Sequence, residues 1–227
     1  MQIARAERVT AWTRRVGARS LALTATLTLL ASCQSAYYAT MESFGQHKRD
    51  ILVDRVEDAR DDQEEAKEQF ADALEAFMSV TAYDGGDLRD VYDRLSDELD
   101  RCEDKAARVR KRIDSIEEVS EDLFAEWSKE LEQYSSDQFR QQSEAQLRDT
   151  RTRYDQLIGA MNRAEARMEP VLVVFRDQVL FLKHNLNAQA IASLQGNVAA
   201  IESDVSQLIA EMDVAIDEAN AFIEGMG

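Results

Sequence analysis

The most reactive side chains of this 227-residue chain belong to two cysteines, Cys33 and Cys102, and two histidines, His47 and His184. Each histidine has a lysine beside it and a phenylalanine three residues before it, so the Glu-x-x-His pairs of di-iron helical bundles are missing. The motifs of zinc proteases, dithiol redox proteins, serine hydrolases and phosphate-binding loops are missing too. The sequence therefore predicts a protein that is not an enzyme and holds no metal or other cofactor.

Cys33 follows a segment with the features of an export signal. Five arginines and one acid occur in the first 20 residues, and residues 21–30 are an uncharged run of Leu, Ala and Thr. The Leu-Ala-Ser-Cys motif at residues 30–33 resembles the lipobox of bacterial lipoproteins. The resemblance implies that the Cys33 thiol receives a diacylglycerol and that the preceding peptide bond is cut. We therefore expect a signal peptide at 1–32, which is removed, a lipidated Cys33 with a short tether at 33–37, and attachment to a membrane through acyl chains.

Other interpretations of the leader are weaker. Residues 21–32 are too few for a retained transmembrane helix, which takes roughly 20 residues. An ordinary secretory signal with Cys33 as a bystander stays open, because small residues also suit ordinary signal peptidase. Arg14 and Arg15 lack the residues that follow the pair in a twin-arginine signal. Lipoproteins held at the inner membrane typically have Asp after the cysteine; here Gln34 follows Cys33, so the resemblance to lipoproteins implies the outer membrane, facing the periplasm.

The net charge and the cysteine content limit the kinds of partner and disulfide that the chain can have. The chain has 27 basic and 44 acidic residues, a net charge of −17, and loss of the basic leader would make it more acidic still. Such a surface repels phosphate backbones, so we expect no nucleic-acid binding. Cys102 has no partner for an intramolecular disulfide once Cys33 is acylated. It is interpreted as a small buried residue, with an intermolecular disulfide in a homo-oligomer as the alternative.

Apolar periodicity predicts long helices. Residues 88–127 carry apolar side chains at alternating steps of four and three, the pattern of a left-handed coiled coil. Weaker stripes of the same kind occupy residues 52–80, 147–175 and 191–222. One proline and eight glycines leave few breaks. The pattern predicts an all-α fold, an elongated antiparallel four-helix bundle of long helical hairpins with coiled-coil packing.

Breaks in the pattern predict the helix ends. Gly85 and Gly86 mark a turn, after which Asp87 can cap the next helix, and residues 185–187 suit a second turn. Near residues 134–137, Ser135 and Gln138 fit a capping box, and a continuous helix is left open. We expect one helical domain at 38–227, with helices at about 38–82, 87–134, 136–185 and 187–224.

Residues 171–182 are apolar around more of a helix than one partner can cover, and Pro170 precedes them. The first interpretation is the most enclosed part of the bundle. The alternative is an apolar groove for a partner or a lipid tail. The candidate surface residues are Val171, Val174, Phe175, Leu180 and Phe181.

Three stretches carry a family resemblance: the Tyr-Tyr pair at 37–38 and the runs at 44–60 and 181–188. They resemble the bacterial family catalogued as domain of unknown function 2959 (DUF2959). The resemblance implies an exported helical protein and supplies no catalytic residues. Our hypothesis is a membrane-anchored periplasmic lipoprotein that acts as a non-enzymatic helical scaffold or as a binding module for an envelope protein. The alternative is a carrier or sensor of a lipid or apolar ligand that uses residues 171–182.

Overall fold

A computed structural model of the chain describes residues 48–81, 87–185 and 187–226. These residues are helical apart from short connections and contain no strand, which confirms the all-α class. All of them except Lys48 belong to one compact unit, residues 49–227. The predicted signal peptide, Cys33, the tether, the start of the first expected helix and the glycine turn at 82–86 lie outside the described residues.

Four long helices make up the described part of the chain: α3 (Lys48–Thr81), α4 (Leu88–Glu130), α5 (Asp137–His184) and α6 (Ala188–Met226). Two of the expected helix ends are built as predicted. The Asp87 carboxylate accepts a hydrogen bond from the Arg89 amide at 2.8 Å and caps α4. At the end of α5, the side-chain amide of Asn185 donates to the Phe181 carbonyl at 2.9 Å. Pro170 lies inside α5, which continues through it.

The connection between α4 and α5 resolves the alternative of a continuous helix. The chain tightens into a 3₁₀ turn, η1 (Leu131–Gln133), before α5 begins at Asp137. The predicted cap at Ser135 is wrong, because Ser136 is the capping residue. Ser136 has extended backbone angles and its hydroxyl accepts from the Phe139 amide at 3.5 Å, three residues on, which is the register an N-cap requires.

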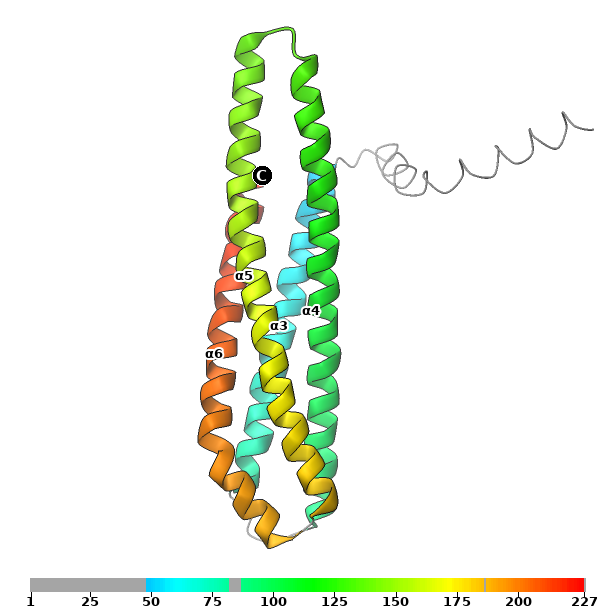
Figure 1. The fold of residues 1–227 in the computed structure, drawn as a ribbon, viewed down its shortest axis with the longest axis vertical. Coiled ribbons are helices and arrows are strands. Elements are labelled where there is room, and N and C mark those ends of the chain that lie inside the picture. Colours follow the sequence, from blue (N-terminus) through cyan, green and yellow to red (C-terminus); the bar gives the residue numbers. More distant parts are fainter. Residues whose placement is uncertain (1–47, 82–86, 186, 227) are drawn as a thin grey trace, which may run out of the picture. The chain divides into compact units, whose positions relative to one another are not determined.

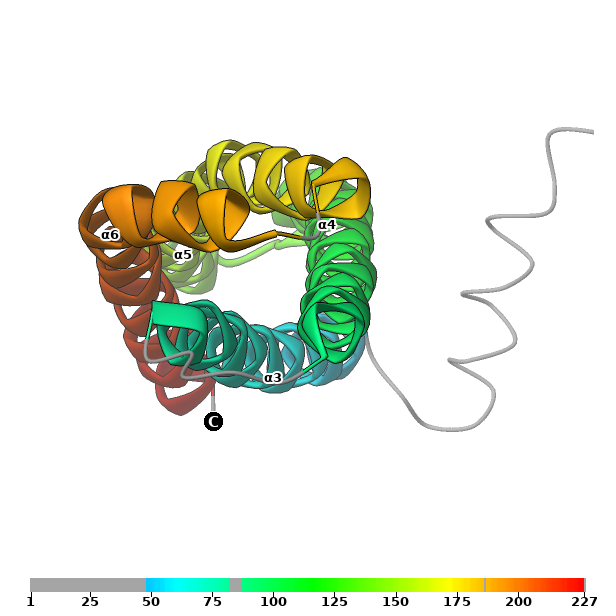
Figure 2. The same ribbon diagram turned by 90° about the horizontal axis from the view of Figure 1, so that it is seen from below.

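The helices form a ring in which consecutive helices are antiparallel neighbours (Figure 1). Figure 2, seen along the bundle, shows that α3 also lies beside α6 and closes the ring. At least one ion pair bridges each of the four interfaces; examples are Arg112–Asp62 at 2.6 Å, Arg110–Glu165 at 2.7 Å, Arg163–Glu211 at 3.6 Å and Lys67–Asp213 at 3.0 Å. The predicted four-helix bundle is confirmed.

The core lies inside this ring and follows the predicted stripes. Its largest buried side chains include Phe70 and Phe77 of α3, which pack against Phe175 of α5 with ring centroids 6.4 and 4.6 Å away. Four of the described buried residues are polar or charged, Asp62, Gln63, Ser120 and Ser143, and Gln63 differs from the others in its hydrogen bonding. The side chain of Gln63 is 0% exposed, and neither its amide nitrogen nor its oxygen has a hydrogen-bond partner among the described residues.

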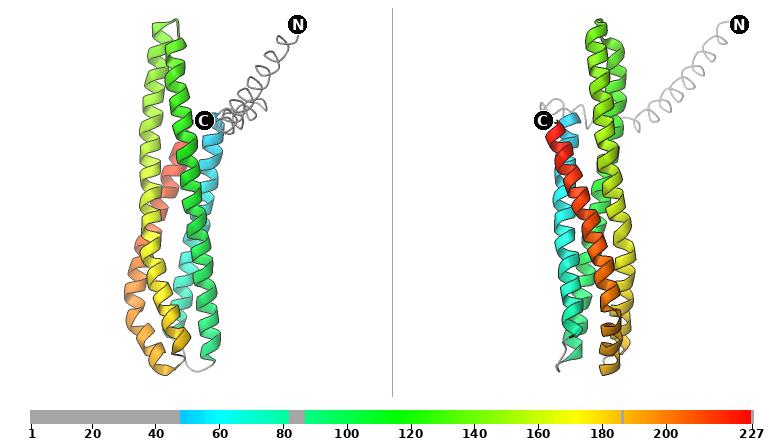
Figure 3. Two further views of the ribbon diagram at one scale, coloured as in Figure 1. Left: turned by 45° about the vertical axis from the view of Figure 1, so that its right-hand side comes forward. Right: turned by 90° about the vertical axis from the view of Figure 1, so that its left-hand side faces the viewer.

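The four helices end at different levels. Helices α4 and α5 continue past the first residues of α3 and the last residues of α6, so they project as a two-helix hairpin (Figures 1 and 3). Inside this hairpin the Trp127 indole donates to the Ser143 hydroxyl at 2.8 Å. At its tip, Tyr134 and Phe139 are 45% and 59% exposed. The end of the four-helix section therefore forms a step at the base of the hairpin.

Candidate functional site

The apolar segment at 171–182 is divided between the core and the surface. Val171 and Phe175 are buried, Val174 is half-buried, and Leu180 and Phe181 are exposed. An α-helix turns 100° per residue, so a segment that is apolar on all sides presents one face inward and another outward. The interpretation as core holds for the inward face alone.

The outward face of this segment is a short apolar stripe on α5. It consists of Val173, Leu180 and Phe181, all at least 40% exposed, with Asp177 between them in the sequence. Residues seven and eight apart lie on one side of a helix, two turns from each other. On the adjacent side of α5, Arg176 pairs with Glu103 of α4 at 2.6 Å. The stripe is thus a surface feature of the bundle bordered by charged side chains.

Cys102 is a free cysteine with no exposed area, deep on the inward face of α4. Its sulfur lies 3.6 Å from the Gln69 carbonyl oxygen of α3. Burial raises the pKa of the Cys102 thiol to about 12. The thiol is therefore protonated at neutral pH and has no exposed surface, which agrees with the interpretation as a small core residue.

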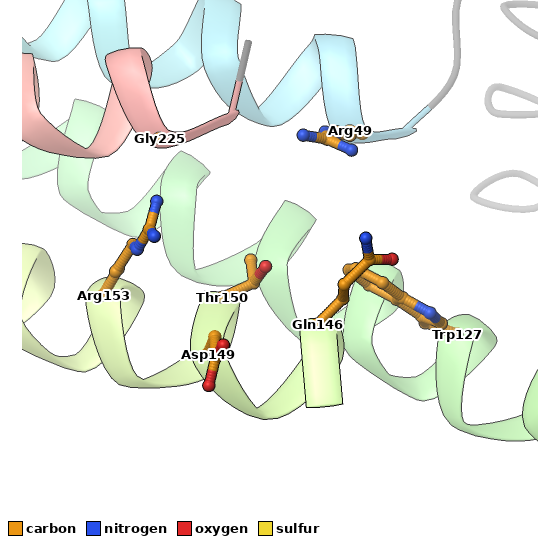
Figure 4. A pocket seen from close by; sticks show the side chains of 7 residues that line it. All are labelled: Arg49, Trp127, Gln146, Asp149, Thr150, Arg153 and Gly225. Carbon is orange, nitrogen blue, oxygen red and sulfur yellow. The ribbon is translucent and has the colours of Figure 1, made fainter. Parts of the chain in front are cut away.

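A cleft lies at the step where the four-helix section ends. It has a volume of about 220 Å³ and is lined by residues from all four helices (Figure 4). Helix α3 contributes Arg49, α4 contributes Trp127, and the last turn of α6 contributes Gly225; the remaining lining residues, all from α5, are Gln146, Asp149, Thr150 and Arg153. The lining is mainly polar and includes two guanidinium groups.

Contacts around the cleft position both arginines. The Arg49 guanidinium donates to the carbonyl oxygen of Met226 and so joins the start of α3 to the end of α6. The Arg153 guanidinium lies over Gly225, where a Cβ atom would be only 1.9 Å from its Nη1. Glycine at position 225 therefore leaves the space that Arg153 occupies. Figure 4 shows Thr150 between the two arginines and the Asp149 side chain pointing away from them.

This cleft was not predicted from the sequence. Neither Arg49 nor Arg153 was among the candidate site residues. Their positions are 104 residues apart, and no local pattern brings them together. The sequence does hold a chemical indication of the cleft. Both residues are arginines in a strongly acidic chain, and Gly225 is one of few glycines.

Within 48–81, 87–185 and 187–226 there is no group of three or more His, Cys, Asp or Glu side chains placed to hold a metal ion. None of the helices in these ranges is both long and apolar enough to span a membrane. Of the two histidines, His184 is the last residue of α5 and is exposed, and His47 lies outside the described ranges.

The fold and the cleft define an all-α protein, an antiparallel four-helix bundle with a projecting hairpin and a polar cleft at the hairpin's base. The family model described as "Protein of unknown function (DUF2959)" matches residues 37–226, and the chain belongs to this family. No curated protein and no solved structure matches it. The resemblance found in the sequence is thereby confirmed.

Proposed function

We propose that this protein is a lipoprotein of the bacterial cell envelope, anchored through acyl chains on Cys33 at the outer membrane and facing the periplasm. Its helical bundle acts there as a non-enzymatic scaffold or protein-binding module. The lipobox-like motif and the charge pattern of the leader support the anchor. A bundle with a net negative charge has little electrostatic attraction to anionic lipids, so the acyl chains supply the membrane affinity.

The projecting α4–α5 hairpin is the observation that carries the binding role. Its tip exposes Tyr134 and Phe139 beyond the ends of α3 and α6. Aromatic side chains are enriched in the residues that contribute most to protein interfaces, because they bury much apolar area with few rotatable bonds. A helical arm with aromatic residues at its end is well suited to contact a second protein at a distance from the bundle.

Fractionation of cells tests the anchor. The wild-type chain should sediment with the outer membrane and incorporate labelled palmitate, whereas Cys33→Ala should appear in the soluble periplasmic fraction with unchanged helical circular dichroism. Cys102→Ala is the matched control, because it removes the other cysteine and should leave both properties intact. A Cys33→Ala chain that still sediments with membranes would overturn the anchor.

Crosslinking in living cells tests the arm. A photo-reactive residue at position 139 should give a discrete adduct with an envelope protein. The same residue at position 156, which is also exposed on α5 but lies nearer the middle of the bundle, is the control. Equal adducts from both positions, or none from position 139, would remove the binding role from the hairpin tip.

The stripe of Val173, Leu180 and Phe181 favours a second candidate, a carrier or sensor of a lipid or apolar ligand. Three large apolar side chains exposed on one helix face are a surface that such a ligand would cover. Protein purified under mild conditions should then release about one equivalent of lipid on solvent extraction, and Phe181→Asp should lower that yield. Ligand-free protein would leave the scaffold as the better function.

A further inference from the structure

We propose that the cleft lined by Arg49 and Arg153 is a binding site for a small anionic group of the phosphate type, either a free phosphate ester or the headgroup of a phospholipid. This site is separate from the exposed aromatic tip and from the apolar stripe. It does not depend on the anchor at Cys33. It assigns a ligand to the end of the bundle where α3 begins and α6 ends.

Arg49 and Arg153 form no ion pair with a carboxylate of the described residues; Arg94, Arg151 and Arg167 share this property, but they do not line the cleft. Arg110, Arg112, Arg163 and Arg176 each pair with a carboxylate on a neighbouring helix. Arg49 instead donates to a neutral backbone carbonyl, and Arg153 makes no ion pair or hydrogen bond with the described residues. Two guanidinium groups and one carboxylate, that of Asp149, give the described lining of this cleft a net positive charge in a chain of 44 acids.

The single acid of the cleft does not cancel this charge. Asp149 precedes Arg153 by four residues, a spacing at which a helical ion pair commonly forms. In this structure no such pair occurs between the two described side chains, and Figure 4 shows the carboxylate directed away from both arginines. The cleft therefore keeps the guanidinium N–H donors available to an anion, whose oxygen atoms can accept two parallel hydrogen bonds from one arginine.

The remaining lining residues suit a small polar ligand. Thr150 carries a hydroxyl and Gln146 an amide, and both can donate to an oxygen atom. The Trp127 indole N–H is already engaged by Ser143, so its ring forms a wall of the cleft and leaves its donor occupied. A volume of about 220 Å³ lies below the range of roughly 300–1,000 Å³ typical of drug-sized ligands. A phosphate group with its first ester carbon fits this size better than a whole cofactor.

The absence of a side chain at Gly225 makes room for the Arg153 guanidinium. Arg153 occupies the volume that any larger residue at 225 would need. Since the clashing atoms are the far end of a flexible side chain, Gly225→Ala should displace the guanidinium and leave the helices in place. It therefore offers a way to disturb the site without removing a charge.

The test uses inorganic phosphate as the probe and Trp127 as the reporter. In full-length chain carrying Trp12→Phe, Trp127 is the only tryptophan, and it lines the cleft. Titration with phosphate at constant ionic strength should give a saturable change in its fluorescence. Because a charge-assisted hydrogen bond is strong, Arg153→Gln and Arg49→Gln should each weaken binding by about tenfold or more. Gly225→Ala should weaken it in the same direction.

Arg148→Gln is the matched control. It removes one positive charge from an exposed position of α5 that does not line the cleft, and it should change the affinity by less than about twofold. Circular dichroism melts of all variants show whether the bundle remains folded. No saturable response, or an equal loss in Arg148→Gln, would overturn the proposal, because general charge attraction would then explain the result.

A second arm identifies the source of the phosphate. The Cys33→Ala chain is mixed with phosphatidylcholine vesicles that contain or lack phosphatidic acid. Sedimentation that requires both phosphatidic acid and Arg153 supports a lipid headgroup as the ligand. Phosphate binding in solution without vesicle binding supports a soluble phosphate ester.

Discussion

Gln63 is predicted to lower the stability of the bundle that encloses it. Replacing it with methionine keeps a similar unbranched shape and removes two polar atoms that have no partner among the described residues. A buried polar group without a hydrogen bond costs about 1–3 kcal/mol. Gln63→Met should therefore raise the free energy of unfolding by about 1–3 kcal/mol, and each kcal/mol corresponds to roughly 2–4 °C in Tm for a domain of this size.

A second glutamine of α3 provides the matched control. Gln69 donates to a Glu98 carboxylate oxygen of α4 at 2.6 Å, so the same substitution there removes a real hydrogen bond. Gln69→Met should lower the free energy of unfolding by about 1–2 kcal/mol, opposite in sign to Gln63→Met. Urea denaturation followed at 222 nm measures both, and an unchanged slope shows that the comparison concerns stability alone. A Gln63→Met variant less stable than wild type would refute the reasoning, because the amide would then have a partner.

The other predictions concern Cys102 and the two faces of the 171–182 segment. In a Cys33→Ala chain at pH 8.5, Cys102 should resist alkylation while folded and react fully in denaturant, as mass spectrometry would show; rapid labelling of the folded chain would contradict its burial. Because burial raises the pKa of this thiol to about 12, the unfolded chain loses the proton first, and the contribution of Cys102 to stability should fall as pH rises above about 8.5. Phe175→Ala should destabilise the bundle by about 3–5 kcal/mol, whereas the exposed Phe181→Ala should change it by less than about 1 kcal/mol. Equal losses in urea denaturation would show that the segment does not divide as described.

Much of the fold could be predicted because the buried face and the caps of a helix depend on residues that are close together in the sequence. Along α4, Leu95, Leu99, Cys102, Val109 and Ile113 were placed on one stripe by their spacing, and all are buried. The cap at Asp87 followed from an acid that precedes an apolar run. The cap between α4 and α5 was placed one residue early because Ser135 and Ser136 are both good caps, and the extended backbone that selects Ser136 is not visible in the sequence.

The candidate sites were harder to predict because they depend on how the helices are arranged. Residues 171–182 are apolar on all sides, and only the neighbouring helices decide that Phe175 faces the core while Leu180 and Phe181 face outward. The cleft depends on where α3 starts and α6 ends beside the longer α4–α5 hairpin. Small changes in helix length would move Arg49 away from Arg153. Such relations between distant segments are set by packing and leave no periodic signal.

The contact between the first and last helices has a consequence for the order of folding. Arg60 meets Asn220 and Lys67 meets Asp213, pairs separated by 160 and 146 residues. The α4–α5 hairpin instead joins neighbours in sequence and can form early, because local contacts close small loops. The inward face of α3 is covered on both sides only after α6 has packed beside it. The bundle is therefore incomplete until the 39 residues of α6 have packed beside α3.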